Sequence, residues 1–403
     1  MSKLKICVIQ GMWLPYRAGV FEELSKVSNM EFVFYFGRTR QSLRHQAFSR
    51  PEETSAFRFK YRFLGSIAYQ GKMPTSPFHW KRSFQIFPTL LFNVLNGKFD
   101  AVVTDGGMFL DLPFLLLGCK LTKKPLIVWS GGNMKDNFPK PSDPLIKKII
   151  YAYLRSIYKR SDAAIAYGRG TKEFLVALGM NRNKVFIALN TVDTLLFEEI
   201  PKTNKDKIET LRKALGLEKK KVILYVGSLE IRKKVDDLLR IFEGIKGKLP
   251  ATSLLLVGDG PDKQRLVELC RRKGIDNDVK FIGWTDYLDI PLYYALSDVF
   301  VLPSQGGITV MEAIASGKPV IVSEECNALY SVPGIVRQKE NGFITKSGDP
   351  NEIQAYLYEL LTNPNLAAKM GARSKGIAFE LFSIDKMIQG FVQAIKFAIR
   401  ARR

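Results

Sequence analysis

The chain has 403 residues, of which 46% are hydrophobic and 25% are charged. This composition is that of a globular protein of about two domains, and it excludes a disordered chain, a collagen-like fibre and a small disulfide-rich scaffold. Lysine and arginine number 61 against 39 acidic residues, so the formal net charge is +22. A net charge of this size says little about the fold but much about binding partners. It predicts attraction to phosphate groups, anionic lipids or nucleic acid.

Cysteines and histidines are few and scattered. The four cysteines form no CxxC pair, so we expect buried thiols in a reducing compartment. The two histidines, His45 and His79, are too few for a histidine-based metal centre. No apolar run reaches the ~18 residues that a membrane-spanning helix needs. The start, KLKICVIQG, is too short for a signal peptide and is typical of a first buried strand. We therefore expect a soluble or peripheral protein.

Short runs rich in valine and isoleucine alternate with longer segments of helical period, which is typical of parallel sheets covered by helices. In the first half the expected strands are KICVIQ, EFVFYF, DAVVT, PLIVW, AAIAY and KVFIAL. The second half continues with VILYVG, SLLLVG, VKFIG, VFVLP and PVIVS. Between the two series lies EEIPKTNKDKIETLRKALGLEKKK, whose composition indicates a solvated connection. We expect an α/β protein made of two doubly wound units.

The loops that follow the strands of the second series contain small and charged residues. In chain order these are Gly227, Ser228, Arg232 and Lys233, then Gly258 and Asp259, then Trp284, and finally Ser304, Gly306 and Gly307. In open α/β sheets, ligands bind beyond the carboxyl ends of the strands, where such loops gather. One loop of small residues would mean little, but four in register predict a site where the backbone approaches a ligand closely.

The stretch after VFVLP predicts an anion site. Gly306 and Gly307 precede a short helix that we expect over residues 309–316. The free amides and the dipole at the start of a helix favour a diphosphate. Glu312, one turn into this helix, is placed to accept hydrogen bonds from ribose hydroxyls. The glycines alone fit an ordinary strand–turn–helix with a solvated glutamate equally well.

Lys233 is the second element of this site. It lies beside Arg232 and Lys234 in GSLEIRKKVDDLL, where a cation would neutralise a departing diphosphate. A solvated basic turn is the alternative in a chain this cationic. The position favours a functional role, because the turn faces the same sheet edge as the two glycines.

Taken together, these motifs resemble those of the GT-B glycosyltransferases, specifically the large retaining glycosyltransferase family 4. The second half resembles the family nearly end to end, and the first half at fewer positions. The motifs are the strand–Gly–x–Leu turn with Lys233, Gly258-Asp259-Gly260-Pro261, Asp298-Val-Phe-Val-Leu-Pro303-Ser304, Glu312-Ala313-x-Ala315-x-Gly317-Lys318-Pro319-Val320, Glu340-Asn341-Gly342-Phe343, and in the first half Pro15-Tyr16-Arg17 and Asn190-x-Val192-Asp193. Singly none is specific, but the set is.

The resemblance implies a GT-B fold, with two Rossmann-like, doubly wound parallel-sheet domains facing across a cleft. It implies an acceptor-binding domain over 1–198, a donor-binding domain over 199–382, and a C-terminal helix over 383–403 that packs back on the first domain. The donor would be a nucleotide sugar, and transfer would need no metal and no cofactor. The single Asp-x-Asp, Asp276 to Asp278, precedes VKFIG and is expected to be a turn at the wrong sheet edge for the site.

Carried over by position, Lys233 would contact the donor diphosphate, with Arg232 as a second catalytic cation. Glu312 would contact the ribose, and Trp284 would flank the base. The full donor side would comprise Gly227, Ser228, Lys233, Gly258, Asp259, Trp284, Ser304, Gly306, Gly307, Ile308, Thr309 and Glu312. The acceptor side would comprise Gly11, Tyr16, Arg17, Asp105, Gly106 and Asn133.

Three positions depart from the family pattern. Ser304 stands where the family usually begins its Glu-x7-Glu pair, and Ser228 stands where arginine is frequent, so that Arg232 would substitute. The sequence WSGGN, residues 129–133, lies where a histidine is common. The implied retaining reaction passes through an oxocarbenium-like state. The departing diphosphate serves there as base for the incoming hydroxyl, and the protein supplies positioning and electrostatics.

Basic and apolar residues are combined in the first half. Residues 143–160 have an i, i+3, i+4 apolar stripe with cations on the remaining faces, which fits an amphipathic surface helix and a core-packing helix with snorkelling cations equally. The run FRFKYRF and residues 79–95 also mix aromatic and basic side chains. From these segments we expect a peripheral protein on the inner face of the cytoplasmic membrane, with a lipid-linked saccharide acceptor in surface-polysaccharide or lipopolysaccharide synthesis.

Two other functions stay open. A GT-B-like sugar-nucleotide epimerase would use carboxylate and histidine acid–base groups, and this chain has only two histidines. Nucleic-acid binding would suit the positive charge and the aromatic–basic interleaving. However, the basic residues are spread through both halves, and we find no RNA- or DNA-binding motif.

Overall fold

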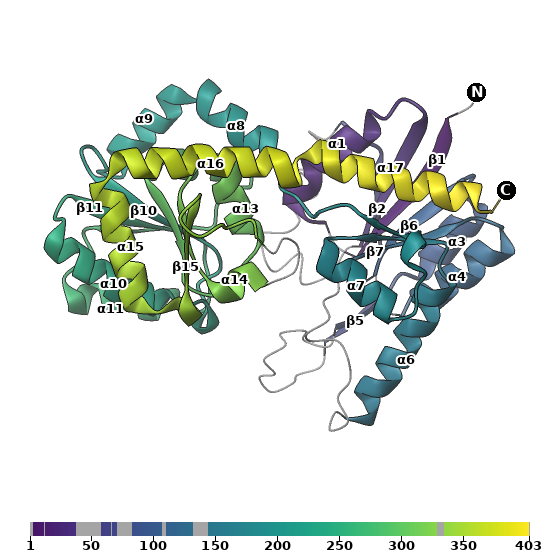
Figure 1. Cartoon of the computed structure of the whole chain (residues 1–403). Coiled ribbons are helices and arrows are strands. Elements are labelled where there is room, and N and C mark those ends of the chain that lie inside the picture. Colours follow the sequence, from purple (N-terminus) through teal and green to yellow (C-terminus); the bar gives the residue numbers. More distant parts are fainter. Residues whose placement is uncertain are drawn as a thin grey trace. The chain divides into compact units, whose positions relative to one another are not determined.

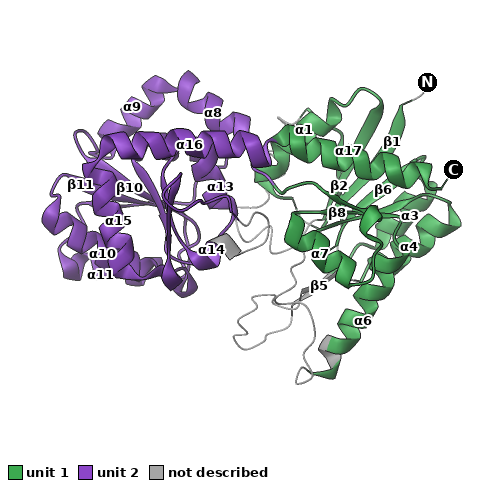
Figure 2. Ribbon diagram, viewed as in Figure 1, with its two compact units in different colours: residues 1–190, 384–403 green, residues 191–383 purple. Residues whose placement is uncertain are grey.

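The computed structural model describes residues 3–11, 13–37, 58–65, 67–70, 83–106, 110–131, 144–328 and 334–402. The chain divides into two compact units, coloured separately in Figure 2. Unit 1 comprises residues 1–190 and 384–403, and unit 2 comprises residues 191–383. The division falls after Asn190 rather than after residue 198, because the helix α8 (Thr194–Thr203) packs against α12 (Ile290–Leu296) and α13 (Ile308–Ala315) of unit 2.

A seven-stranded sheet forms the centre of unit 1, with the strand order β3-β2-β1-β6-β7-β8-β9 and parallel pairing throughout. A separate antiparallel pair is formed by β4 (Ile67–Gln70) and β5 (Ser83–Ile86). The strands of the large sheet are β1 (Leu4–Gln10), β2 (Met30–Gly37), β3 (Tyr61–Leu64), β6 (Ala101–Asp105), β7 (Leu126–Ser130), β8 (Ala163–Ala166) and β9 (Val185–Ile187).

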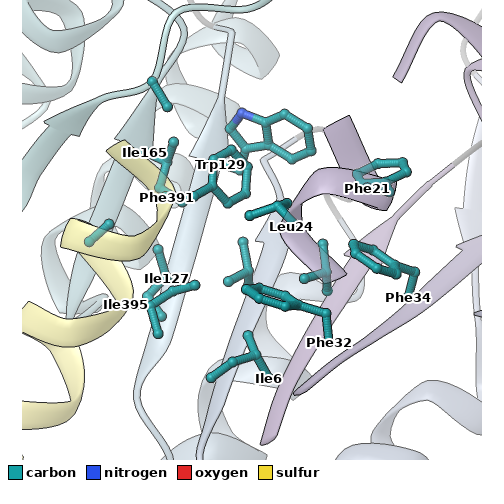
Figure 3. Close-up of a cluster of buried hydrophobic side chains, with 14 of the residues drawn as sticks. Ile6, Phe21, Leu24, Phe32, Phe34, Ile127, Trp129, Ile165, Phe391 and Ile395 are labelled. Carbon is teal, nitrogen blue, oxygen red and sulfur yellow. The ribbon is translucent and has the colours of Figure 1, made fainter. Parts of the chain in front are cut away.

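Helices cover both faces of this sheet, because successive side chains of a strand point to opposite sides. On β7, Ile127 and Trp129 face α1 (Ala18–Ser25) and α17 (Ile384–Arg400), with which they form one buried apolar cluster (Figure 3). The other face of the sheet packs against α3 (Pro88–Asn96), α4 (Leu112–Leu121), α6 (Leu145–Arg160) and α7 (Arg169–Ala177). The C-terminal helix therefore belongs to unit 1, as the resemblance implied (Figure 1).

Unit 2 contains a six-stranded parallel sheet in the order β12-β11-β10-β13-β14-β15. Its strands are β10 (Lys221–Val226), β11 (Thr252–Val257), β12 (Val279–Gly283), β13 (Val299–Leu302), β14 (Val320–Ser323) and β15 (Gly342–Thr345). Its further helices are α9 (Lys205–Ala214), α10 (Val235–Lys248), α11 (Lys263–Lys273), α14 (Glu324–Ala328), α15 (Pro350–Thr362) and α16 (Pro364–Phe382), with a short 3-10 turn η4 (Ile231–Lys233) before α10.

The expected fold class is confirmed, and every strand expected from the sequence is present. The solvated connection expected between the two series contains the helices α8 and α9, which contact α12, and α9 buries none of its residues. The helix α9 was not expected because few of its residues are large and apolar. The strand β15 was also missed. It begins at Gly342, which lies so close to β14 that a Cβ there would come within 2.1 Å of the Val320 carbonyl oxygen.

Candidate functional site

The loops after β10, β11 and β12 form a hydrogen-bonded rim at the carboxyl edge of the unit 2 sheet. The Leu229 amide donates to the Asp259 carbonyl at 3.0 Å, and the Gly258 amide donates to the Gly283 carbonyl at 2.8 Å. Gly258 has φ of 134°, and a Cβ there would lie 2.0 Å from the carbonyl oxygen of Gly227. Only glycine lets these two loops approach so closely.

Lys233 ends η4, and its side chain reaches the loop that follows β13. Its ammonium group donates a hydrogen bond to the main-chain carbonyl of Gln305, the residue directly before Gly306 and Gly307. Burial, together with the neighbouring Arg232 cation, lowers the pKa of Lys233. The structure thus brings the lysine and the glycine turn together at the sheet edge where both were expected.

The helix α13 begins directly after Gly307, so the glycine turn leads into free amides at a helix start. Glu312, on this helix, is buried, and burial raises the pKa of its carboxyl group to about 8 despite a hydrogen bond from Tyr294. The Tyr294 hydroxyl lies 3.2 Å from the Glu312 carboxylate and 2.8 Å from the Thr309 carbonyl oxygen. A buried carboxyl group with so perturbed a pKa is typical of functional sites.

Ser304 follows β13, and its side chain is buried. No residue that the structure describes forms a hydrogen bond with its hydroxyl group. The Cys326 thiol, from α14, donates to the Ser304 carbonyl oxygen. Burial raises the pKa of Cys326 to about 12, although Lys233 acts in the opposite direction. Cys326 was not predicted as a site residue; its only sequence signal is its position just after β14, whose carboxyl end lies at the same edge.

Arg232 and Ser228 were predicted for this edge and lie there in local hydrogen bonds. The Arg232 guanidinium donates to the Glu230 carboxylate at 2.6 Å in a partly exposed ion pair. The Ser228 carbonyl accepts a hydrogen bond from the Tyr225 hydroxyl at 2.9 Å. The charge of Arg232 is therefore partly offset by Glu230, whereas Lys233 meets a neutral carbonyl.

Asp259 and Trp284 complete the predicted donor side. The Asp259 carboxylate accepts from the Gly260 amide at 2.8 Å and from the Lys263 ammonium at 3.1 Å. Burial raises the pKa of Asp259, but these hydrogen bonds outweigh it and leave the pKa below its usual value. Trp284 follows β12 with 38% of its surface exposed, which leaves part of the indole open to a ligand.

Unit 1 gathers a second polar group at the carboxyl edge of its sheet. The buried Arg17 guanidinium lies 4.1 Å from the ring centroid of Trp129 and donates to the Tyr167 hydroxyl. Its Nε and Nη1 atoms have no hydrogen-bond partner among the described residues. Burial lowers the pKa of Arg17, but Tyr16, Tyr167 and Asp105 raise it by more, so the side chain stays charged.

The other residues predicted for the acceptor side lie at the same edge where they are described. Gly11 follows β1, and the Gly106 amide, after β6, donates to the Trp129 carbonyl at 2.8 Å. Asn133 lies outside the described residues. Trp129 was noted only as the start of WSGGN, and Tyr167 was missed; a large aromatic at the end of a buried strand is the signal that both share.

The predicted Asp-x-Asp turn lies at the opposite edge, just before β12. Its Asp278 pairs with Lys220 at 2.9 Å and with Lys246 at 2.7 Å. Across the described ranges, no three histidine, cysteine or acidic side chains are grouped as a metal ion would require. Among the described helices, none is both long enough and apolar enough to cross a membrane.

Comparison with known proteins adds to this geometry. Residues 207–376, which include Lys233 and Glu312, match the family described as glycosyl transferases group 1. An uncharacterized glycosyltransferase of Haemophilus influenzae is 31% identical over 50% of this chain. A GDP-mannose-dependent alpha-(1-6)-phosphatidylinositol monomannoside mannosyltransferase of Mycolicibacterium smegmatis is 28% identical over 47% of it. The matches span 58% and 50% of those two relatives' lengths.

The whole chain resembles solved structures in fold. Anabaena Alr3699/HepE, crystallised with UDP, superposes with a TM-score of 0.69 and 17% identity, covering 98% of this chain and 100% of the other. At this identity the likeness shows the fold alone. The fold is that of the GT-B glycosyltransferases, with two parallel-sheet α/β domains.

Proposed function

We propose that this protein is a retaining glycosyltransferase of family 4 that transfers a hexose from a nucleotide sugar to a lipid-linked saccharide. The observation that carries the proposal is the contact of Lys233 with the carbonyl that leads into the Gly306–Gly307 turn, within the stretch that matches glycosyl transferases group 1. The UDP complex of the fold neighbour and the phosphatidylinositol acceptor named for the mycolicibacterial relative support the same direction.

Unit 2 would hold the donor. A diphosphate at the start of α13 would meet the helix amides and the Lys233 ammonium group, which now bonds only a neutral carbonyl. Glu312 would accept hydrogen bonds from the ribose, and Trp284 would flank the base. In the proposed reaction the lysine and the amides supply the positive charge that the leaving group needs, so no metal takes part.

The proposed transfer breaks the bond between the anomeric carbon and the diphosphate oxygen, and the electron pair stays with the diphosphate. The acceptor hydroxyl bonds to the same face of the anomeric carbon and gives its proton to a diphosphate oxygen. The Lys233 ammonium group, which bonds the Gln305 carbonyl beside the glycine turn, would stabilise the charge that develops on that oxygen. Positioning and electrostatics then account for the protein's contribution.

A thermal-shift screen tests the donor assignment. In the presence of EDTA, at least one of the UDP-, GDP- and dTDP-sugars should raise the melting temperature. Ligand at a hundred times its dissociation constant stabilises the native state by about 2.7 kcal/mol. No shift with any of the three sugars or their nucleotides would contradict the proposal. Conversion of the sugar nucleotide into an isomer without acceptor would identify an epimerase instead.

The proposed transfer would belong to the synthesis of a surface polysaccharide or lipopolysaccharide at the inner face of the cytoplasmic membrane. Within the protein, Arg17 would act on the acceptor side. The substitution Arg17→Met should leave the free energy of unfolding within about 1 kcal/mol of the original, because relief of two buried unpaired donors offsets the lost cation–π contact and the lost hydrogen bond to the Tyr167 hydroxyl. Transfer should nevertheless fall, with a higher KM for the acceptor and an unchanged donor affinity. Urea unfolding and steady-state kinetics measure both; full activity would remove Arg17 from the site.

A further inference from the structure

Three neighbouring helices of unit 1 expose large apolar side chains. α3 packs on α4, and α4 packs on α6, on the face of the sheet opposite α1 and α17. Isolated exposed apolar residues are ordinary, but a group on adjacent helices marks an interaction site. The residues of this α3–α4–α6 surface are Phe92 (68% exposed) and Leu95 on α3, Phe114, Leu117 and Leu121 (71%) on α4, and Leu145 (72%), Ile149 and Ile150 on α6.

The helix α4 shows why these side chains are not a loosely packed core. Its residues Leu115, Leu116 and Cys119 are already buried against the sheet. Phe114 and Leu117, on its other side, are exposed. The helix is thus apolar all round, with Lys120 as its single charged residue. A helix of this kind is normally covered on both sides, and here the sheet covers one side only.

The charged residues of these three helices are all cationic. The helices α3, α4 and α6 contain no acidic residue. Lys120, Arg155 and Lys159 are exposed on α4 and α6. These three helices therefore combine apolar side chains with cations and carry no acidic side chain of their own.

A cavity of about 700 Å³ beside α3 also combines apolar side chains with cations. Phe92 lines it together with four cations that come from or next to the strands, namely Lys5, Lys60, Arg62 and Lys98. Glu31 in the same lining pairs with Lys60 at 2.8 Å. The cavity lies near the amino ends of β1, β2 and β3, so it is separate from the carboxyl edge that holds Arg17.

We propose that the α3–α4–α6 surface docks unit 1 on an anionic lipid bilayer. The apolar side chains would enter the boundary between headgroups and acyl chains, and the flanking cations would contact lipid phosphates. A second copy of the chain is disfavoured as occupant, because two surfaces of the same positive sign would repel each other. This inference rests on the proposed function, since a lipid-linked acceptor places the enzyme at a bilayer.

Cosedimentation with vesicles tests the surface directly. At low salt the full chain should bind vesicles of phosphatidylcholine with phosphatidylglycerol and should not bind phosphatidylcholine alone. Leu117→Ser and Lys120→Glu should each lower the partition coefficient by roughly tenfold. The matched controls are Phe379→Ser, at a residue 60% exposed on α16, and Lys213→Glu, which like Lys120 lies in the last turn of a helix. Both controls should bind as the unchanged chain does.

The outcomes separate this inference from the proposed function. If the chain stays unbound with anionic vesicles, or if the surface variants bind as well as the controls, the surface assignment falls, and an intact nucleotide-sugar thermal shift leaves glycosyl transfer standing. If vesicle binding follows the predicted pattern but no nucleotide sugar shifts the melting temperature, the surface stands and the transferase proposal falls. A dimer in sedimentation velocity that Leu117→Ser dissociates would overturn the bilayer in favour of a second copy.

Discussion

Replacing Lys233 by alanine is expected to lower kcat/KM for sugar transfer by about 10²–10³-fold, the usual cost of removing one preorganised group that stabilises developing charge. The ammonium group is partly withdrawn from solvent and bonds the Gln305 carbonyl at the turn before α13. When a diphosphate leaves, no other ammonium group described at this turn takes that position. The loss should appear mainly in kcat, because the charge on the leaving oxygen is greatest in the transition state.

Lys234→Ala is the matched control for this prediction. Lys234 is adjacent in sequence, but its ammonium group donates to the Ser347 carbonyl at 2.9 Å rather than to Gln305. Its removal should change kcat/KM little. Transfer by Lys233→Ala at the level of the unchanged chain, with the fold verified by its melting temperature, would remove Lys233 from the reaction.

The residues at the donor edge could be predicted because they follow strands of one parallel sheet. In a parallel sheet every strand ends at the same edge, so the sequence placed Lys233 after β10 and Gly307 after β13 at one edge. Their direct proximity follows from the pairing of β10 with β13, which the sequence did not predict. Cys326 and Tyr167 could not be predicted. Their place depends on how side chains pack between a strand end and a loop, and neither residue belongs to a motif.

The segment over residues 143–160 shows where periodicity stops being informative. The apolar stripe of this segment fitted a core-packing helix and an amphipathic surface helix equally. Each description holds for one end of α6. Ile157 and Tyr158 at its C-terminal end are buried, whereas Ile149 and Ile150 near its N-terminal end are exposed. Only the extent of the neighbouring sheet decides which turns of the helix are covered. The exposed side of α4 escaped prediction for the same reason.

Glu312 is expected to make the stability of the protein depend on pH. Its pKa is about 8 in the folded chain, raised by burial from the usual 4.5. A raised pKa means that the group's stabilising contribution is complete below about pH 4.5 and is lost as the pH rises through about 8. Because one pKa unit corresponds to about 1.4 kcal/mol, the free energy of unfolding should fall by up to about 5 kcal/mol over this window.

Urea unfolding across this pH range, compared with Glu312→Gln, isolates the effect. Glutamine resembles the neutral carboxyl group and does not titrate, so the variant should lose this part of the pH dependence and overtake the unchanged chain in stability at high pH. Lys318, whose pKa is lowered to about 8 by burial, titrates in both proteins and cancels in the difference. The exposed Glu218→Gln is the control. Parallel stability curves for Glu312→Gln and the unchanged chain would refute the assignment.

The same carboxyl group should couple donor binding to pH. Ribose hydroxyls donate more strongly to a carboxylate than to a neutral acid, and a hydrogen bond to a charged group contributes roughly 1.5–3 kcal/mol. The affinity for a nucleotide diphosphate should therefore rise about tenfold or more as the pH increases through about 8.

In Glu312→Gln the affinity should be weaker and should not change with the ionisation of residue 312. Subtracting one pH profile from the other removes the ionisation of the diphosphate itself. Isothermal titration at several pH values measures both profiles; affinity that follows the same course in the two proteins would mean that Glu312 does not hold the ribose.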